Sequence, residues 1–108
     1  IDEGKMKTSI EQAKKDADIV IVSFHFGEEY QSIQNNYQER ISRMAVDFGA
    51  NLVVGHHPHV VQPIEKYKGA YIAYSLGNFV FDQYFSDWNI LYIERNSCVS
   101  NAPIQVLY

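Results

Sequence analysis

Two short runs of apolar, largely β-branched residues constrain the fold more than any other feature of this sequence. Residues 19–24 and 52–54 show no alternation of polar and apolar side chains, which is typical of strands buried on both faces of a sheet. Each run follows a segment with helical spacing of its apolar residues, at residues 9–16 and 38–48. This helix–strand–helix–strand order predicts an α/β layered fold in which the two strands are parallel.

Capping signals predict where the two helices begin and end. Thr8 and Glu11 fit a capping box, in which each side chain bonds a backbone amide at the start of a helix. The first helix is therefore expected from about residue 9. Gly49 follows the last apolar residue of the second helix and is expected to end that helix in a left-handed conformation.

The rest of the chain has the pattern of hairpins. Residues 60–67 and 70–75 are strand-like and flank a Lys-Gly pair, which predicts a hairpin with a two-residue turn. A second pair of strands is expected at residues 90–94 and 104–108.

Three of the four histidines follow the second strand directly, in the sequence His-His-Pro-His at residues 56–59. Pro58 disfavours the α region for His57 and so favours an extended backbone there. In an extended segment residues i and i+2 point to the same side. We therefore expect His57 and His59 to face together and His56 to face away.

The first strand also ends in a histidine, His25, which is followed closely by Glu28 and Glu29. The ends of neighbouring parallel strands lie along one rim of a sheet, so His25 is expected near the pair formed by His57 and His59. Imidazole nitrogens suit zinc, manganese and iron, and a glutamate could add a carboxylate or orient an imidazole. The pattern favours a metal site over a hydrogen-bonded structural network of histidines, which stays open as an alternative.

Length, composition and charge exclude several classes of protein. A chain of 108 residues with 46% hydrophobic and 20% charged residues is typical of at most one globular domain. The net charge of −4 and the lack of a Lys/Arg cluster argue against nucleic-acid binding. No apolar run is long enough to span a bilayer, and the single cysteine excludes an internal disulfide. The polar start without an initiator methionine indicates the interior of a longer protein.

Three blocks of the sequence resemble successive blocks of the bacterial capsule-synthesis CapA family, whose members are also called poly-γ-glutamate biosynthesis proteins. The blocks lie at residues 22–30, 49–65 and 74–82, and include His-His-Pro-His and Ser-Leu-Gly-Asn-Phe. Two departures are Asn51, where the family usually has Asp, and Phe26, where Trp is commoner. We expect both to be tolerated.

The resemblance implies a fold similar to the calcineurin-like metallophosphoesterases, a β-sandwich flanked by helices. In that pattern His25 takes the place of a lone histidine after a strand. His57 and His59 take the place of a His-x-His pair, and His56 stands where glycine would be. The early Asp, His and Asn ligands of the pattern have no counterpart here. Residues 1–108 are therefore expected to form a single partial domain, the C-terminal portion of such a domain, with half of a metal site.

The resemblance also implies a role for each candidate residue. His25, His57 and His59 would bind divalent metal ions, with manganese, zinc and iron all open. His25, His57 and Glu29 would take part in catalysis. Four more residues are expected in supporting or alternative roles: His56, Glu28, Asn78 and Asp82.

The implied function is capsule or poly-γ-glutamate biosynthesis with a metal-dependent phosphoesterase-like site, inactive in this chain alone. The alternative is a non-catalytic cell-surface scaffold or polymer-handling protein on the same fold. The expected partners are a phosphoester or poly-γ-glutamate-related substrate, other capsule-synthesis proteins, and either the missing N-terminal half or a second copy of the chain. By resemblance, the full-length protein would be extracytoplasmic and membrane-associated in the bacterial cell envelope.

Overall fold

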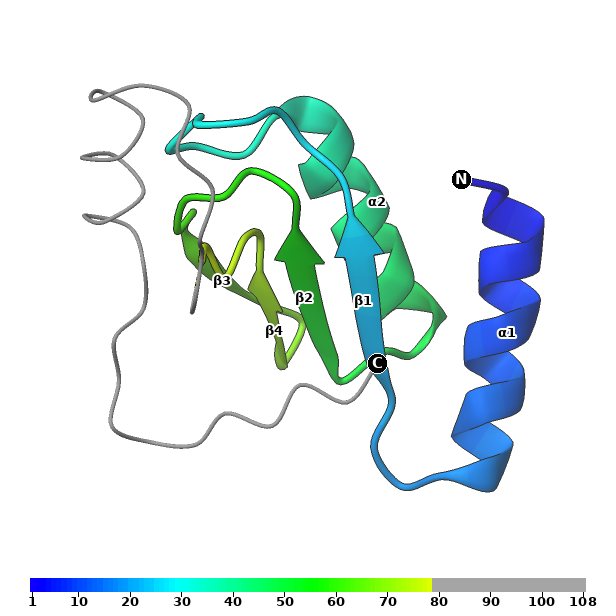
Figure 1. The fold of residues 1–108 in the computed structure, drawn as a ribbon. Helices are drawn as coiled ribbons and strands as arrows, with labels where there is room; N and C mark the ends of the chain where they lie inside the picture. Colours follow the sequence, from blue (N-terminus) through cyan, green and yellow to red (C-terminus); the bar gives the residue numbers. More distant parts are fainter. Residues whose placement is uncertain (79–108) are drawn as a thin grey trace.

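The computed structural model describes residues 1–78, which form two helices and one four-stranded sheet (Figure 1). Its helices and strands follow in the order α1 (Glu3–Asp16), β1 (Ile21–His25), α2 (Asn36–Phe48), β2 (Leu52–His56), β3 (Ile64–Tyr67) and β4 (Ala70–Ala73). The predicted mixture of helices and strands is confirmed. The strands expected at residues 90–94 and 104–108 lie outside the described residues.

The strands lie in the order β1-β2-β4-β3. β1 and β4 both pair with β2 in parallel, and β3 pairs with β4 antiparallel. The predicted parallel arrangement of the first two strands is confirmed. So is the hairpin, because Lys68 (φ 47°) and Gly69 (φ 82°) form the turn between β3 and β4 with the two positive φ values of a type I′ turn.

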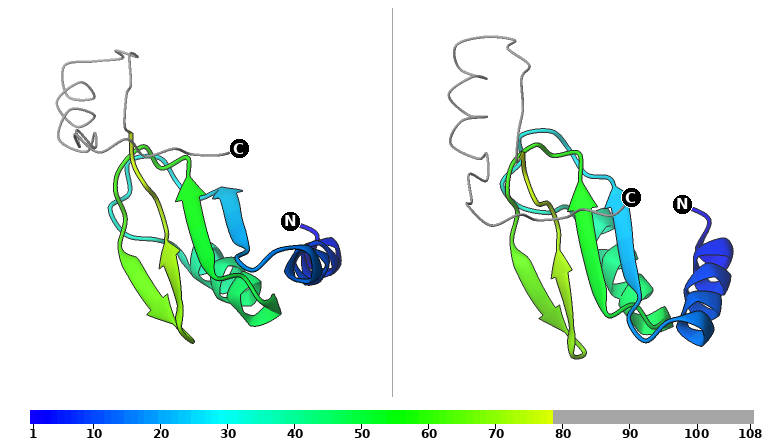
Figure 2. Two further views of the ribbon diagram at one scale, coloured as in Figure 1. Left: turned by 90° about the horizontal axis from the view of Figure 1, so that it is seen from below. Right: turned by 60° about the horizontal axis from the view of Figure 1, so that its bottom comes forward.

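One face of the sheet packs against α2 and carries the core (Figure 2). Val22, Val53 and Ile72 are neighbours in the register of β1, β2 and β4, so their side chains share this covered face. Val53 and Ile72 are fully buried, as are Ile41 and Ala45 of α2. The apolar stripe that predicts α2 therefore supplies the helical side of the core.

The opposite face of the sheet is largely exposed within the described part of the chain. Ile21, Leu52 and Tyr71 are register neighbours on this face. Ile64 of β3 pairs with Ala73, two residues after Tyr71 on β4, and so lies on the same face. Ile21 is 59% exposed, Tyr71 51% and Ile64 68%. We call these four residues the open sheet face. The expectation that both strands are buried on both faces is therefore wrong. An uninterrupted apolar run does not show whether the described part of the chain covers both faces of the sheet.

The first helix begins earlier than its predicted capping box. Asp2 caps α1 by accepting a hydrogen bond from the Lys5 amide at 3.0 Å. Thr8 lies inside the helix, where its hydroxyl donates to the carbonyl of Gly4 at 3.0 Å. The prediction fails because Asp is as good a cap as Thr and comes first, and because a helical Thr can bond the carbonyl four residues back.

The end predicted for α2 is confirmed, and its start is two residues earlier than predicted. Gly49 follows the helix with φ 122°, and its amide donates back to the carbonyl of Val46. At the other end Asn35 and Gln38 form a capping box, which places the start of the helix before the residue 38 expected from the sequence. Neither helix within residues 1–78 is long and apolar enough to cross a membrane.

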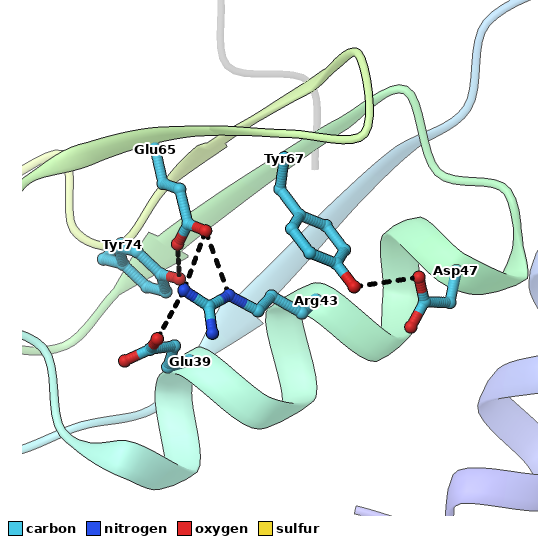
Figure 3. Close-up of polar contacts among 6 residues, drawn as sticks. All are labelled: Glu39, Arg43, Asp47, Glu65, Tyr67 and Tyr74. Atoms are coloured by element: carbon cyan, nitrogen blue, oxygen red, sulfur yellow. Dashed lines mark hydrogen bonds and ion pairs between the residues drawn. The ribbon is translucent and has the colours of Figure 1, made fainter.

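Charged and hydroxyl side chains fasten α2 to the hairpin (Figure 3). Glu65 of β3 accepts from Arg43 at 3.0 Å and from the Tyr74 hydroxyl at 2.5 Å. Arg43 also pairs with Glu39, one turn earlier on α2. Burial alone would raise the pKa of Glu65, but the bonds from Tyr74 and Arg43 outweigh it and hold that pKa below its ordinary value. Burial, together with Glu65, raises the pKa of the Tyr74 hydroxyl.

Candidate metal centre

The segments that follow β1, β2 and β4 meet at one edge of the sheet. His25 and His56 are the last residues of β1 and β2 and are register partners. Beyond them, the Phe26 amide donates to the carbonyl of His56 at 3.0 Å, and the Leu76 amide donates to the carbonyl of Gly55 at 3.1 Å. We call residues 25–31, 56–62 and 75–78 the histidine rim. It lies where parallel strands end, as ligand sites of α/β sheets do.

The His57-Pro58-His59 turn does not have the predicted extended backbone. His57 has φ 100° and His59 has φ 60°, both in the region that side chains rarely adopt. The amide of Tyr30, itself at φ 59°, donates to the carbonyl of Pro58 at 2.8 Å, and Pro58 is fully buried. Pro58 restricts its predecessor but does not decide the fold of the turn. The hydrogen bond from the Tyr30 amide, which is far away in sequence, holds this backbone at positive φ.

The turn still brings the predicted pair together, and adds a carboxylate. Glu29, His57 and His59 each place one possible ligand atom within 4.8 Å of the others. Two atoms bound to one tetrahedral zinc ion at about 2.0–2.2 Å lie roughly 3.3–3.6 Å apart, so these donors would have to close by up to about 1.5 Å to bind one ion. Two imidazoles and one carboxylate are a donor set that suits zinc, manganese or iron. The residues present therefore fit a divalent transition metal.

The other two histidines lie at the edge of this group. The imidazole centroids of His25 and His57 are 4.8 Å apart, so His25 lies beside the predicted pair without being one of the three clustered donors. His56 pairs in register with His25, and its Nε2 is buried without a hydrogen-bond partner. Burial lowers the pKa of His56, and the nearby charge of His25 lowers it further, so the neutral imidazole is favoured.

Three carboxylate and amide candidates have different positions. Glu28 lines a separate hollow of about 170 Å³ together with Gln34 and lies outside the donor group. Asn78 is 6% exposed, and its Oδ1 lies 2.9 Å from Nδ1 of His59. Asp82 lies outside the described residues.

Sequence reasoning missed two buried glutamines that hold the Glu29 loop in place. Gln38 and Gln62 are 1% and 2% exposed, and Gln38 donates to Gln62 at 2.8 Å. Gln62 donates in turn to the carbonyl of Gln31 at 2.9 Å. The loop that carries Glu29 is thus tied to the segment that carries His59. The available signals were the Asn35-x-x-Gln38 capping box and a lone amide within an otherwise apolar segment.

Comparison of the sequence with known proteins identifies relatives of this chain. The family model described as bacterial capsule synthesis protein PGA_cap matches residues 1–83. The chain is 57% identical over 74 residues to the PGA biosynthesis protein CapA of Bacillus subtilis (strain 168), a match that covers 68% of this chain. It is 53% identical over 70 residues, 65% of this chain, to the capsule biosynthesis protein CapA of Bacillus anthracis.

A more distant match is a probable polyglutamine synthesis accessory protein of Mycobacterium tuberculosis, 35% identical over 69 residues that make up 64% of this chain. The matched stretches cover only 20%, 17% and 18% of these three relatives, so the chain spans about a fifth of their length. The family model nevertheless covers most of the chain, including every residue of the histidine rim. The chain belongs to the bacterial capsule synthesis protein family.

Proposed function

We propose that this chain forms part of a capsule or poly-γ-glutamate biosynthesis protein with a metal-dependent phosphoesterase-like site on the histidine rim. The observation that carries the proposal is the convergence of Glu29, His57 and His59, from two segments about thirty residues apart, on donor atoms within 4.8 Å of one another. His25, beside His57, would complete the coordination. The relatives named for capsule and PGA biosynthesis supply the biological setting.

The donor chemistry supports a hydrolytic role. A bound divalent ion would supply a Lewis acid for a phosphoester oxygen and make a bound water more acidic. His57 and His59 would offer ring nitrogens as ligands. Glu29 is exposed, so its carboxylate would be free to orient or bridge, or to accept a proton from water. His25 is also exposed and would complete the ligand set.

We further propose that residues 1–108 are the C-terminal portion of a calcineurin-like sandwich. The support is the open sheet face, because exposed Ile21, Ile64 and Tyr71 form the kind of apolar surface that a second layer covers. The covering layer would be the rest of the same protein, or otherwise a second copy. In this proposal the remaining metal ligands come from that part, and the chain alone is inactive.

A second candidate is a non-catalytic cell-surface scaffold or polymer-handling protein. What favours it is the size of the donor group: within residues 1–78 only three donors cluster, and a two-metal hydrolase needs further, bridging carboxylates. In either case the proposed location is the bacterial cell envelope. The proposed partners are capsule-synthesis proteins and a phosphoester or poly-γ-glutamate-related substrate.

The deciding experiment uses the full-length protein and measures bound metal and phosphodiesterase activity together. The double variant His57→Ala/His59→Ala should lose metal and at least about 100-fold of the activity, since both would be direct ligands. Lys15→Ala, on the exposed face of α1, is the control and should retain both. Activity that survives the double change overturns the assignment. A wild-type protein that binds poly-γ-glutamate without metal-dependent hydrolysis supports the scaffold instead.

A further inference from the structure

Asn78 is a buried polar residue that the proposed hydrolysis does not use. It is 6% exposed and follows Gly77, whose φ of 69° turns the chain after β4. The turn is held in place twice: the Gly77 amide donates to the Ser75 hydroxyl at 3.3 Å, and Leu76 forms an isolated antiparallel bridge with Val61. The segment after β4 thus brings Asn78 next to the donor group, to which the segments after β1 and β2 contribute the other residues.

The contact between Asn78 and His59 bears on which ring nitrogen of His59 carries the proton. The Oδ1 atom of Asn78 lies 2.9 Å from Nδ1 of His59. With its amide oxygen facing the ring, Asn78 can only accept at this contact, and this arrangement assigns the proton to Nδ1 of His59. In a neutral imidazole with its proton on Nδ1, the lone pair is on Nε2. Free histidine has no such fixed choice between its nitrogens.

The oxygen of the Asn78 amide makes this contact, whereas the nitrogen of the same amide makes no hydrogen bond. Nδ2 of Asn78 is buried without a hydrogen-bond partner, and an unpaired buried donor destabilises the fold. A leucine of similar volume would avoid that cost. The oxygen therefore makes the one hydrogen bond that this side chain has in the described structure, and that bond goes to a candidate ligand.

We propose that Asn78 is a positioning residue that holds His59 in the Nδ1-protonated tautomer and leaves Nε2 as the nitrogen that can bind a ligand. The consequence for the site rests on the proposed metal-binding function. The tautomer itself does not, because it is a property of the metal-free protein. Asn78 acts through His59 and needs no contact with substrate.

The test is to record ring-nitrogen NMR signals of the histidines in the ¹⁵N-labelled full-length protein, after chelation and at a pH where the rings are neutral. His59 should show a protonated Nδ1 and an unprotonated Nε2. Asn78→Ala should shift the proton toward Nε2, whereas Asn78→Asp should retain the wild-type pattern, because a carboxylate also accepts from Nδ1. His25 signals that stay unchanged show that each variant keeps its fold.

A wild-type His59 protonated on Nε2, or an unchanged tautomer in Asn78→Ala, overturns the proposal. Zinc titration of the same proteins separates it from the proposed function. Asn78→Ala should weaken zinc binding by about 10–100-fold, with recovery in Asn78→Asp. If the tautomer is as expected but the wild type binds no zinc, the metal site is wrong and the positioning role stands. If zinc binds equally well to all three proteins, Asn78 does not position a ligand.

Discussion

The interface between α2 and the sheet contrasts with the histidine rim. At the interface Ile41, Val53 and Ile72 are at most 1% exposed, and the charges of Arg43 and Glu65 pair with each other. The rim has the opposite character. Of the four non-glycine residues with positive φ within residues 1–78, it holds three: Tyr30, His57 and His59.

The comparison indicates that the α2–sheet interface stabilises the fold, whereas the backbone of the histidine rim destabilises it. Backbone in a rarely populated region costs about 1–3 kcal/mol per residue and persists only where the surroundings fix it. At the rim those surroundings are hydrogen bonds from distant segments, such as the one from Tyr30 to Pro58, and the buried glutamines. The rim is thus arranged for the convergence of its side chains, and the packed interface offsets the strain. Substitutions should have opposite effects in the two regions.

The largest effect is expected at Gly55, where the interface meets the rim. A Cβ at this position would lie 2.0 Å from the carbonyl oxygen of Tyr74 and 2.7 Å from a ring carbon of Phe26. Neither the β2 backbone nor its neighbour can move far, so Gly55→Ala should cost about 3 kcal/mol or more of unfolding free energy. Denaturant unfolding measures this. Gly4→Ala in α1, where a Cβ meets only Asp2 at 3.5 Å, should be neutral or slightly stabilising.

Adjacent residues on opposite faces of β4 give the next largest difference. Ile72→Ala should cost about 2–5 kcal/mol, because Ile72 is fully buried against α2. Tyr71→Ala is the matched control and should cost well under half as much in residues 1–108 alone, because Tyr71 is 51% exposed. In the full-length protein the two costs should become similar if a second layer covers the open sheet face. A Tyr71 cost that is equally small in both proteins would contradict the sandwich proposal.

At the rim, a substitution should raise stability while removing function. Glycine adopts φ 100° without the steric strain that His57 has there. His57→Gly should therefore stabilise the chelator-treated protein by about 1 kcal/mol. The same variant should lose metal affinity. Denaturant unfolding with chelator and a zinc titration measure the two properties separately. Asp18→Gly, at an exposed position without a positive φ to relieve, is the control and should destabilise slightly. A His57→Gly protein that is less stable than wild type would show that the His57 side chain contributes to folding more than its backbone costs.

The sequence alone predicts the contrast only in part. The apolar stripe of α2 and the parallel pair of strands were predictable, because each depends on a local period of side chains. The three-residue donor group was partly predictable, since strand ends in a parallel sheet meet at one edge. The reversed backbone at His57 was not, because the Tyr30 bond that holds it comes from a distant segment. The same is true of the Gln38–Gln62 contact, whose partners lie 24 residues apart.

The smallest effect is expected from the polar part of the interface, and it should depend on pH. The pKa of Glu65 is lowered in the folded protein, so its carboxylate stabilises the fold at any pH above the ordinary value near 4.5. That contribution is lost as the pH falls through the lower, folded pKa. Glu65→Gln should therefore cost no more than about 1 kcal/mol at neutral pH, since the pair with Arg43 is partly solvated.

The stability difference between wild type and Glu65→Gln should shrink toward zero in acid, below the folded pKa of Glu65. Unfolding of both proteins across a pH series measures it. Glu11→Gln, on the exposed face of α1, provides the baseline for losing a carboxylate without these partners. If the difference between the Glu65 variant and wild type stays constant into acid, the carboxylate charge contributes nothing. The hold of α2 on the hairpin would then rest on the buried apolar side chains and on hydrogen bonds that do not require a charge.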